Sequence, residues 1–291
     1  MRKLGYLALA MAAAALPAMA QQKVDQKRPA ARDGVVEISN VAGSVNVTGW
    51  DREEVAVTGT LGRGTERLEF SGSGGKTVVK VVLPHDAHHV NGSDLEIQVP
   101  AGSQLEIETV SAEIAVQKVN GKVRLESVSG SITVAGEPSR FDARSVSGEI
   151  EISAANAPGR ARSVSGAVTL KGVAGAVEAS SVSGSLRVAG GEVTSAELET
   201  TSGKISFDAA LAGSARLEAK SVSGNVELTL PASVAAEFDV TTFSGDIAND
   251  FGPAARRTSE HGPGHELSFS TGGAARVVVK DFSGSVRLRK R

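Results

Sequence analysis

Ser-Val-Ser-Gly, the tetrapeptide at residues 127–130, returns at 145–148, 163–166, 181–184 and 221–224. Related tetrapeptides, with Thr or Asp in first place, end in Gly203, Gly245 and Gly284. Counted from Gly130, successive glycines lie 18, 18, 18, 19, 21, 21 and 39 residues apart. We interpret the last interval as two units, the first of which carries Leu267 and Phe269. A repeat of this length indicates an architecture built by stacking one small structural unit.

Apolar residues alternate with polar ones around each of these glycines. A period of two predicts β-strand, because apolar residues on one face of a helix would recur every three and four residues. We expect the residues two before, two after and four after each glycine to share one buried face. Those two before it are Val128, Val146, Val164, Val182, Val222, Phe243 and Phe282. Those two after it are Ile132, Ile150, Val168, Leu186, Ile205, Val226, Ile247 and Val286.

Weaker copies, shifted by half a unit, predict a second strand in each repeat. Examples are Val119-Asn120-Gly121, Val173-Ala174-Gly175 and Leu211-Ala212-Gly213. Two short strands in about 18–21 residues predict an all-β fold, a parallel β-solenoid that rises ~4.8 Å per coil. The alternative is a Greek-key sandwich. A sandwich does not require one tetrapeptide at a fixed spacing, and the hairpin dipeptides of an antiparallel meander are missing between the strands.

The remaining segments give the domain organisation. Residues 34–108 carry less regular strand patterns, and we interpret them as an N-terminal part that caps the coils of residues 109–291 within one domain. Residues 21–33 are polar and without periodicity, which predicts a flexible leader. Residues 252–266 contain Pro253, Pro263 and three glycines, which predicts a loop.

Residues 1–20 have the three-part layout of a secretory signal peptide. Arg2 and Lys3 are followed by an apolar run to Leu16 and by small residues, so cleavage is expected after Ala20. An uncleaved anchor is the alternative, but the run is shorter than the ~20 residues that a bilayer requires. We therefore expect an exported protein, periplasmic or at the cell surface, without a transmembrane segment after cleavage.

Three segments together resemble a known family. Residues 40–47 (Asn-Val-Ala-Gly-Ser-Val-Asn-Val) lead into Gly49-Trp50-Asp51, Val99-Pro100-Ala101-Gly102 precedes Leu105-Glu106-Ile107, and the Ser-x-Ser-Gly units follow. Over residues 34–290 this order resembles the bacterial "putative adhesin" family of unknown function, similar to toastrack-type repeats attached to envelope-stress sensors. The resemblance implies β-strand repeats, an envelope or surface location and no known catalytic residues. One departure is Ala112, which stands where the family has Gly.

Composition excludes several classes of protein. The chain has no Cys, which excludes disulfide scaffolds, thiolate metal sites and a Cys nucleophile. Aromatic residues make up 3%, and removal of Arg2 and Lys3 would leave 29 basic against 33 acidic residues, a net charge of −4. Scattered basic residues and few aromatics argue against nucleic-acid binding. The one basic cluster, residues 287–291, is expected to be a solvated chain end rather than a contact for anionic lipid.

The serines that flank the repeated Val or Phe are expected to point outward in two rows. One row is Ser129, Ser147, Ser165, Ser183, Ser202, Ser223, Ser244 and Ser283. The other is Ser127, Ser145, Ser163, Ser181, Thr200, Ser221 and Thr242. Such rows could bind a repetitive surface such as glycan or ice, but hydrogen bonding along the stack and tolerance of a tight bend is the favoured interpretation.

Histidines supply the remaining candidates for a metal site. His85, Asp86, His88 and His89 crowd one polar segment, and His261 and His265 are four residues apart. Gly262-Pro263-Gly264 between the latter two precludes a helical face, so both groups are expected to be solvated loops. Calcium-binding β-rolls require a repeated aspartate motif that these units lack. We assign no metal, no cofactor and no ligand to either group of histidines.

A carbohydrate enzyme is the remaining alternative class. Glu149 and Glu151 are the one acidic pair on a predicted strand, and no second acid is placed beside them. We assign no catalytic residue and expect a non-enzyme, a structural or adhesin-like module that binds an unknown envelope protein or surface glycan. An envelope-stress or assembly component that binds another envelope protein is the alternative within the same location.

Overall fold

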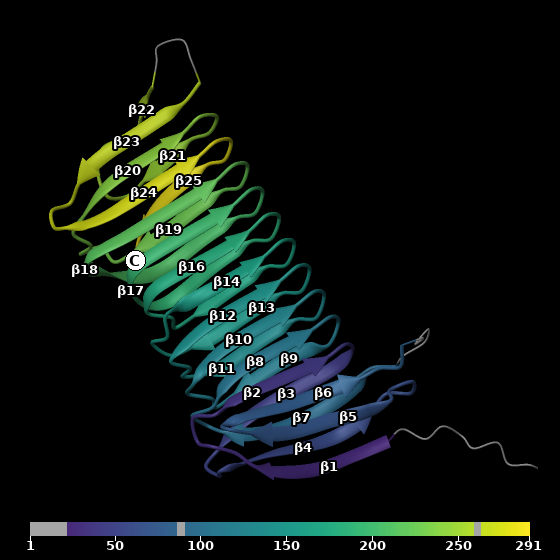
Figure 1. Cartoon of the computed structure of the whole chain (residues 1–291). Coiled ribbons are helices and arrows are strands. Elements are labelled where there is room, and N and C mark those ends of the chain that lie inside the picture. The colour runs from purple at the N-terminus through teal and green to yellow at the C-terminus, as the bar shows by residue number, and fades with distance from the viewer. Residues whose placement is uncertain (1–21, 86–90, 259–262) are drawn as a thin grey trace, which may run out of the picture.

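Apart from turns and loops, the described chain is entirely β-strand. The computed structural model describes residues 22–85, 91–258 and 263–291. Within these residues there are 25 strands and no helix, and therefore none long and apolar enough to cross a membrane. The strands stack into one elongated β-solenoid (Figure 1). The prediction of an all-β solenoid is confirmed. The predicted signal peptide lies outside the described residues.

Each central repeat contributes one strand to each of two layers. The strand before the Ser-Val-Ser-Gly turn lies in the first layer, which contains β8 (Gln104–Thr109), β10 (Lys122–Ser127), β12 (Arg140–Ser145), β14 (Gly159–Ser163) and β16 (Gly175–Ser181). The strand after the turn lies in the second layer, which contains β9 (Glu113–Gln117), β11 (Ile132–Gly136), β13 (Ile150–Ala154) and β15 (Val168–Lys171). The longer strands β17 (Leu186–Thr200) and β18 (Ile205–Ser221) run through both layers.

Neighbouring coils pair in parallel, and equivalent repeat positions stand side by side. Ile132 pairs with Ile150, and Ile150 with Val168, at a constant offset of 18 residues. These second-layer side chains are at most 1% exposed, as the alternation predicted. In the first layer Phe141 pairs with Gly159, where an added Cβ would lie 2.5 Å from the Phe141 ring. The core is therefore a set of aliphatic ladders with large and small residues matched across coils.

The prediction that the valine or phenylalanine of each tetrapeptide faces the core is wrong. Val164 is 44% exposed, whereas Ser163, which was expected to face outward, is 6% exposed. The chain reverses direction between these strands, so the alternation of side chains stops at the turn. The whole row of residues 127, 145, 163, 181, 200, 221 and 242 is buried. The other predicted row, which includes Ser129 and Ser165, is exposed as expected.

The N-terminal end is closed by antiparallel strands. β2 (Val35–Asn40) and β3 (Gly43–Trp50) lie inside the stack, between β8 and β9 on one side and β6 (Lys76–Val82) and β7 (Ser93–Pro100) on the other. β4 (Glu54–Leu61) pairs antiparallel with β7, and β5 (Arg67–Ser73) with β6.

The predicted flexible leader is wrong over most of its length. β1 (Gln22–Pro29) pairs antiparallel with β4 through all eight residues and buries Val24. The sequence gave no sign of this strand because, as the outermost strand of its layer, it turns only one side chain into the core. Lys23, Lys27 and Arg28 are exposed along it, and such charges protect an edge strand from pairing with other chains.

The C-terminal coil is out of sequence order. β24 (Ala275–Asp281) lies between β18 and β20 (Ala236–Thr242), and β25 (Val286–Lys290) lies between β19 (Val226–Leu230) and β21 (Ile247–Asn249). The C-terminal residue Arg291 consequently lies beside β19 and β18, where it contacts Leu230 and Asp208, instead of at the tip of the stack (Figure 1).

Two predictions for this region are therefore wrong. Leu267 and Phe269 do not belong to a further parallel coil, because β23 (His265–Ser270) pairs antiparallel with β20 and with β22 (Arg256–Arg257). The loop expected over residues 252–266 accordingly contains β22 and the start of β23. The basic side chains of residues 287–291 are exposed, as the prediction of a solvated chain end requires, but the segment is not loose, because β25 lies between β19 and β21 and buries Leu288.

Candidate binding surface along the turn edge

The hydroxyl that begins each repeated tetrapeptide fixes the turn from inside. The backbone N–H of Gly166 donates to Ser163 Oγ at 2.9 Å, and equivalent bonds of 2.8–3.0 Å join Gly148 to Ser145, Gly184 to Ser181, Gly203 to Thr200 and Gly224 to Ser221. A buried N–H without an acceptor is costly, so a hydroxyl takes the inner position and the next residue is turned outward.

The glycine that ends the tetrapeptide is required by the neighbouring coil. A Cβ placed on Gly166 would lie 2.0 Å from the carbonyl oxygen of Gly148, and the same approach recurs at Gly148, Gly184, Gly203 and Gly224. Backbone therefore packs directly on backbone at every turn. This contact sets a close spacing between successive turns and aligns them into a straight edge.

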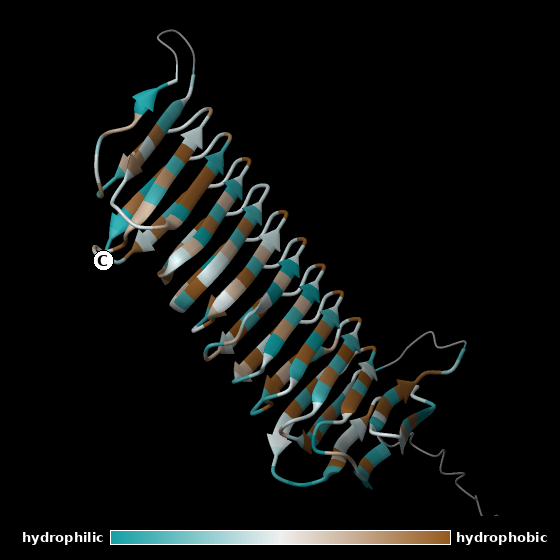
Figure 2. Cartoon of the chain, turned by 60° about the vertical axis from the view of Figure 1, so that its left-hand side comes forward, coloured by the Kyte–Doolittle hydropathy of each residue, from teal (hydrophilic) through white to brown (hydrophobic). Residues whose placement is uncertain are grey.

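The second residue of each tetrapeptide is exposed on that edge. All the exposed large hydrophobic side chains of the described residues occupy this one position, and they are 44–54% exposed. In Figure 2 brown segments recur at the turn tips along one side of the stack. We call this row the turn edge. Its apolar members are Val110, Val128, Val146, Val164, Val182, Val222, Phe282 and Phe243.

An aromatic pair ends the row. The Phe243 and Phe282 rings are stacked, with centroids 4.9 Å apart and an interplanar angle of 8°. They are adjacent because β24 is inserted beside β20, although they are 39 positions apart in sequence. The opposite edge of the stack differs, since Val119 and Val173 there are buried. Among the described residues, the exposed large hydrophobic side chains are therefore confined to one edge.

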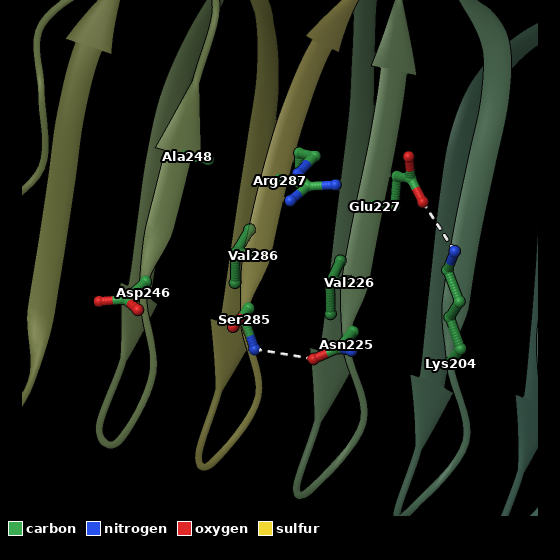
Figure 3. Close-up of a pocket in the computed structure, with 9 residues that line it drawn as sticks. All are labelled: Lys204, Asn225, Val226, Glu227, Asp246, Ala248, Ser285, Val286 and Arg287. Atoms are coloured by element: carbon green, nitrogen blue, oxygen red, sulfur yellow. Dashed lines mark hydrogen bonds and ion pairs between the residues drawn. The ribbon is translucent and has the colours of Figure 1, made fainter.

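Figure 3 shows a hollow on the second layer, where β18, β19, β21 and β25 meet. Lys204 Nζ lies 2.7 Å from Glu227 Oε2, and Arg289 Nε lies 3.1 Å from Glu227 Oε1. The hydrogen bond from Lys204 lowers the pKa of Glu227 below its ordinary value. The backbone N–H of Ser285 donates to Asn225 Oδ1 at 3.0 Å. A carboxylate engaged by two cations is unsuited to proton transfer, so this hollow does not have the arrangement of an acid–base site.

The remaining sequence candidates are not brought together into a site. Glu151 in β13 is paired with Lys171 at 2.5 Å, and Glu149 is exposed at the turn that leads into the same strand. His85 is exposed, whereas His265 lies in β23 with Nδ1 2.7 Å from the carbonyl oxygen of Gly245, so the expectation of a solvated loop is wrong for His265. Asp86, His88, His89 and His261 lie outside the described residues. Among the residues that the structure describes, no three His, Asp or Glu side chains form a metal-binding group.

Asp281 is a feature that the sequence reasoning missed. It occupies the position of the buried hydroxyl, accepts the N–H of Gly284 and accepts a 3.4 Å hydrogen bond from Thr242 Oγ1. Burial raises the pKa of this carboxyl above its ordinary value of 3.8, and the hydrogen bonds oppose that effect only in part. The sequence does show that Asp281 is the one carboxylate at the first position of the repeated tetrapeptide, where the other copies have Ser or Thr.

Comparison with known proteins places the fold. The model of the family described as Toastrack DUF4097 matches residues 29–289. No curated protein matches the chain.

Three solved structures are similar to this chain at low identity. A protein of Parabacteroides distasonis described as a "putative lipid binding protein" is 14% identical, with 92% of this chain and 97% of that chain covered and a TM-score of 0.47. A "putative adhesin" of the same organism is 11% identical, with the same coverage and a TM-score of 0.42. A "putative adhesin" of Bacteroides fragilis is 9% identical, also with the same coverage, and has a TM-score of 0.39.

Proposed function

Because the chain belongs to the Toastrack DUF4097 family and presents an apolar edge that only Thr201 interrupts, we propose that it is a non-enzymatic binding module of the cell envelope or surface. Its contact surface is the turn edge. The partner binds by contact with a row of repeated side chains, and no bond of the partner is changed. The layout of residues 1–20 supports an exported location.

The distribution of exposed apolar side chains carries this proposal. Single exposed valines are ordinary on protein surfaces, but a contiguous row of them marks an interaction site. Here one turn position holds all the exposed large hydrophobic side chains of the described residues. The fold does not require valine or phenylalanine there, because Thr201 occupies the same position in a regularly formed turn.

Two observations support a non-enzymatic role. Several carboxylates on the described faces are held in exposed ion pairs, such as Arg144 with Glu126 at 3.2 Å and Lys171 with Glu151 at 2.5 Å. In the hollow of Figure 3 the Glu227 carboxylate is paired with Lys204 at 2.7 Å, which removes it as a free base. These surfaces stabilise the stack and leave the edge as the feature available to a partner.

Co-sedimentation with the envelope fraction of the producing bacterium tests the proposal. The test variant replaces Val146, Val164 and Val182 with serine, which removes the centre of the row and retains the turns. We expect the wild-type protein to sediment with envelopes and the variant to remain in the supernatant.

The matched control replaces Ser129, Ser147 and Ser165 with alanine on the same edge. This variant should sediment like the wild type, because it retains the apolar row. Loss of sedimentation in the alanine variant alone would show that hydroxyl groups carry the binding. Equal retention of all three proteins would refute the turn edge as the contact surface.

A further inference from the structure

We propose that the partner of the turn edge is a second copy of this chain, which lies beside the first with its coils parallel and in register. This inference rests on the proposed function, because it names the occupant of the same surface. In the co-sedimentation test, the added protein then binds copies of this chain that the envelopes carry. Four properties of the edge point to a second copy: its repeat, its area, its one polar position and the charges that flank it.

The repeat restricts the kind of partner. Successive turns present one apolar side chain per strand spacing, about 4.8 Å, because Val128, Val146 and Val164 follow strands that pair residue for residue. A rigid surface can touch every member of such a row only if it has the same spacing. The turn edge of a second copy has that spacing without any further adaptation.

The area is sufficient for a specific dimer. Eight side chains, each about half exposed, form the row. Covering the rows of both copies would remove on the order of 1,000 Å² from water, which is the lower limit for a specific interface. The aromatic pair of Phe243 and Phe282 would meet the same pair of the second copy and form a cluster of four rings.

The one polar member of the row favours the parallel orientation. Thr201 stands between Val182 and Val222. If the copies are parallel and in register, Thr201 meets the second copy's Thr201. In an antiparallel pair centred on Val182, Thr201 would instead meet Val164. A polar position that matches only itself is a known device for fixing register.

The flanking charges favour the same orientation. A two-fold axis along the stack brings the flank before the turn against the second copy's flank after the turn, at the same level. Arg144 then faces Glu149 of the second copy, and Glu199 faces its Lys204; all four side chains are exposed. Opposite charges across an interface select orientation more than they add affinity.

The antiparallel arrangement is less favourable by the same charge test. It would bring Glu126 against Lys280 and Arg162 against Glu199, but it would also place Arg144 against Lys220 and Glu113 against Asp246, which are two like-charged contacts. The parallel arrangement has one like-charged contact of this kind, Glu108 with Glu113 of the second copy. That contact lies at the end of the row, where solvent and salt screen the repulsion.

Cysteine cross-linking tests the orientation directly, because the chain contains no Cys. Val128→Cys and Val164→Cys would each be treated separately with a short bismaleimide and read as monomer or dimer on a denaturing gel. A parallel, in-register pair places every residue of the row beside itself, so both variants should cross-link. Thr133→Cys, on the exposed face of β11, is the control and should remain monomeric.

Two results would overturn the inference. A third variant, Val182→Cys, lies at the centre of the row. If it cross-links while Val128→Cys and Val164→Cys do not, the pair is antiparallel. A monomeric mass of the wild type in sedimentation equilibrium, with no cross-linking at any of the three valines, would exclude a homodimer.

The affinity of the dimer provides a second measurement. Val164→Asp would place two like charges side by side in the interface, and the dimer dissociation constant should rise about tenfold or more. An unchanged constant would overturn the inference. The inference and the proposed function can fail separately. A monomer that still needs its valines to sediment with envelopes would refute only the homodimer, and a cross-linked dimer with valine-independent sedimentation would refute only the proposed function.

Discussion

At the scale of the residue, the decisive feature is the buried hydroxyl that begins each turn. Ser163 is the last residue of β14 before the chain reverses, and its Oγ accepts the N–H of Gly166 from within the core. Sequence periodicity assigned this serine to the surface and Val164 to the interior, and both assignments are wrong. Period-two alternation holds only while the backbone is extended, and four residues at a turn are enough to break it.

Substitution of Ser163 tests its role. Ser163→Val keeps the size of the side chain within about one methyl group but leaves the Gly166 N–H without an acceptor, so unfolding should become easier by about 1–3 kcal/mol. Ser163→Thr is the matched control, because Thr200 makes the same bond to Gly203 at 3.0 Å. Denaturant unfolding of both variants provides the measurement. Equal losses in the two would contradict the account.

Asp281 should make stability depend on pH. Its pKa is raised in the folded state, so the fold binds this proton more tightly than the unfolded chain does. The contribution is complete below the unfolded value of 3.8 and is lost as the pH rises through the folded value. Asp281→Ser restores the hydroxyl of the other turns, and Tm should rise by a few degrees at pH 7. The gain should shrink at pH 4; a gain independent of pH would show that ionisation is not the cause.

At the scale of the element, the turn glycine determines how closely coils approach. Gly166→Ala would force a Cβ to within 2.0 Å of the Gly148 carbonyl oxygen, and the coils would have to separate locally. The expected cost is about 1–3 kcal/mol or more. Gly213→Ala is the control, because a Cβ there meets nothing within 4 Å, and its effect should lie within about 0.5 kcal/mol. Thermal unfolding of the two variants distinguishes them, and similar costs would show that close approach is not the reason for glycine.

The sequence predicted the strands better than it predicted the turns and ends. Ile132, Ile150 and Val168 lie in the core as their spacing indicated, because extended segments alternate regularly. The tetrapeptide revealed its period but not its conformation, since the same residues suit a strand or a bend. β1 was missed because only Val24 among its eight residues is buried.

At the scale of the whole molecule, the strands at both ends of the stack do not follow the order of the sequence. β2 and β3 are internal although they begin the repeats, and β24 and β25 are internal although they end the chain. Periodicity along the sequence carries no information about this order, because pairing partners are chosen in space. The closed ends protect the stack from addition of further coils, and they leave the turn edge as the long apolar surface of the described residues.

Deletion of residues 275–291 tests the inserted coil. β20 and β21 pair with β24 and β25 and depend on them for contact with the rest of the stack. We therefore expect residues 236–258 and 263–270 to lose amide-exchange protection, while residues 104–221 retain it. If the C-terminal coil simply ended the stack, the deletion would leave residues 236–258 protected, and that result would contradict the topology.

The account depends most on the turn edge facing water, and thiol labelling measures this directly. In a chain without Cys, Val164→Cys should react rapidly under native conditions, at a concentration low enough to keep the protein monomeric. Leu170 lies six residues later and is fully buried in the ladder. The thiol of Leu170→Cys should react at least about 100-fold more slowly than that of Val164→Cys, because the reagent reaches it only through local opening. Equal rates, or a faster reaction at residue 170, would contradict the assignment of the valine row to the surface.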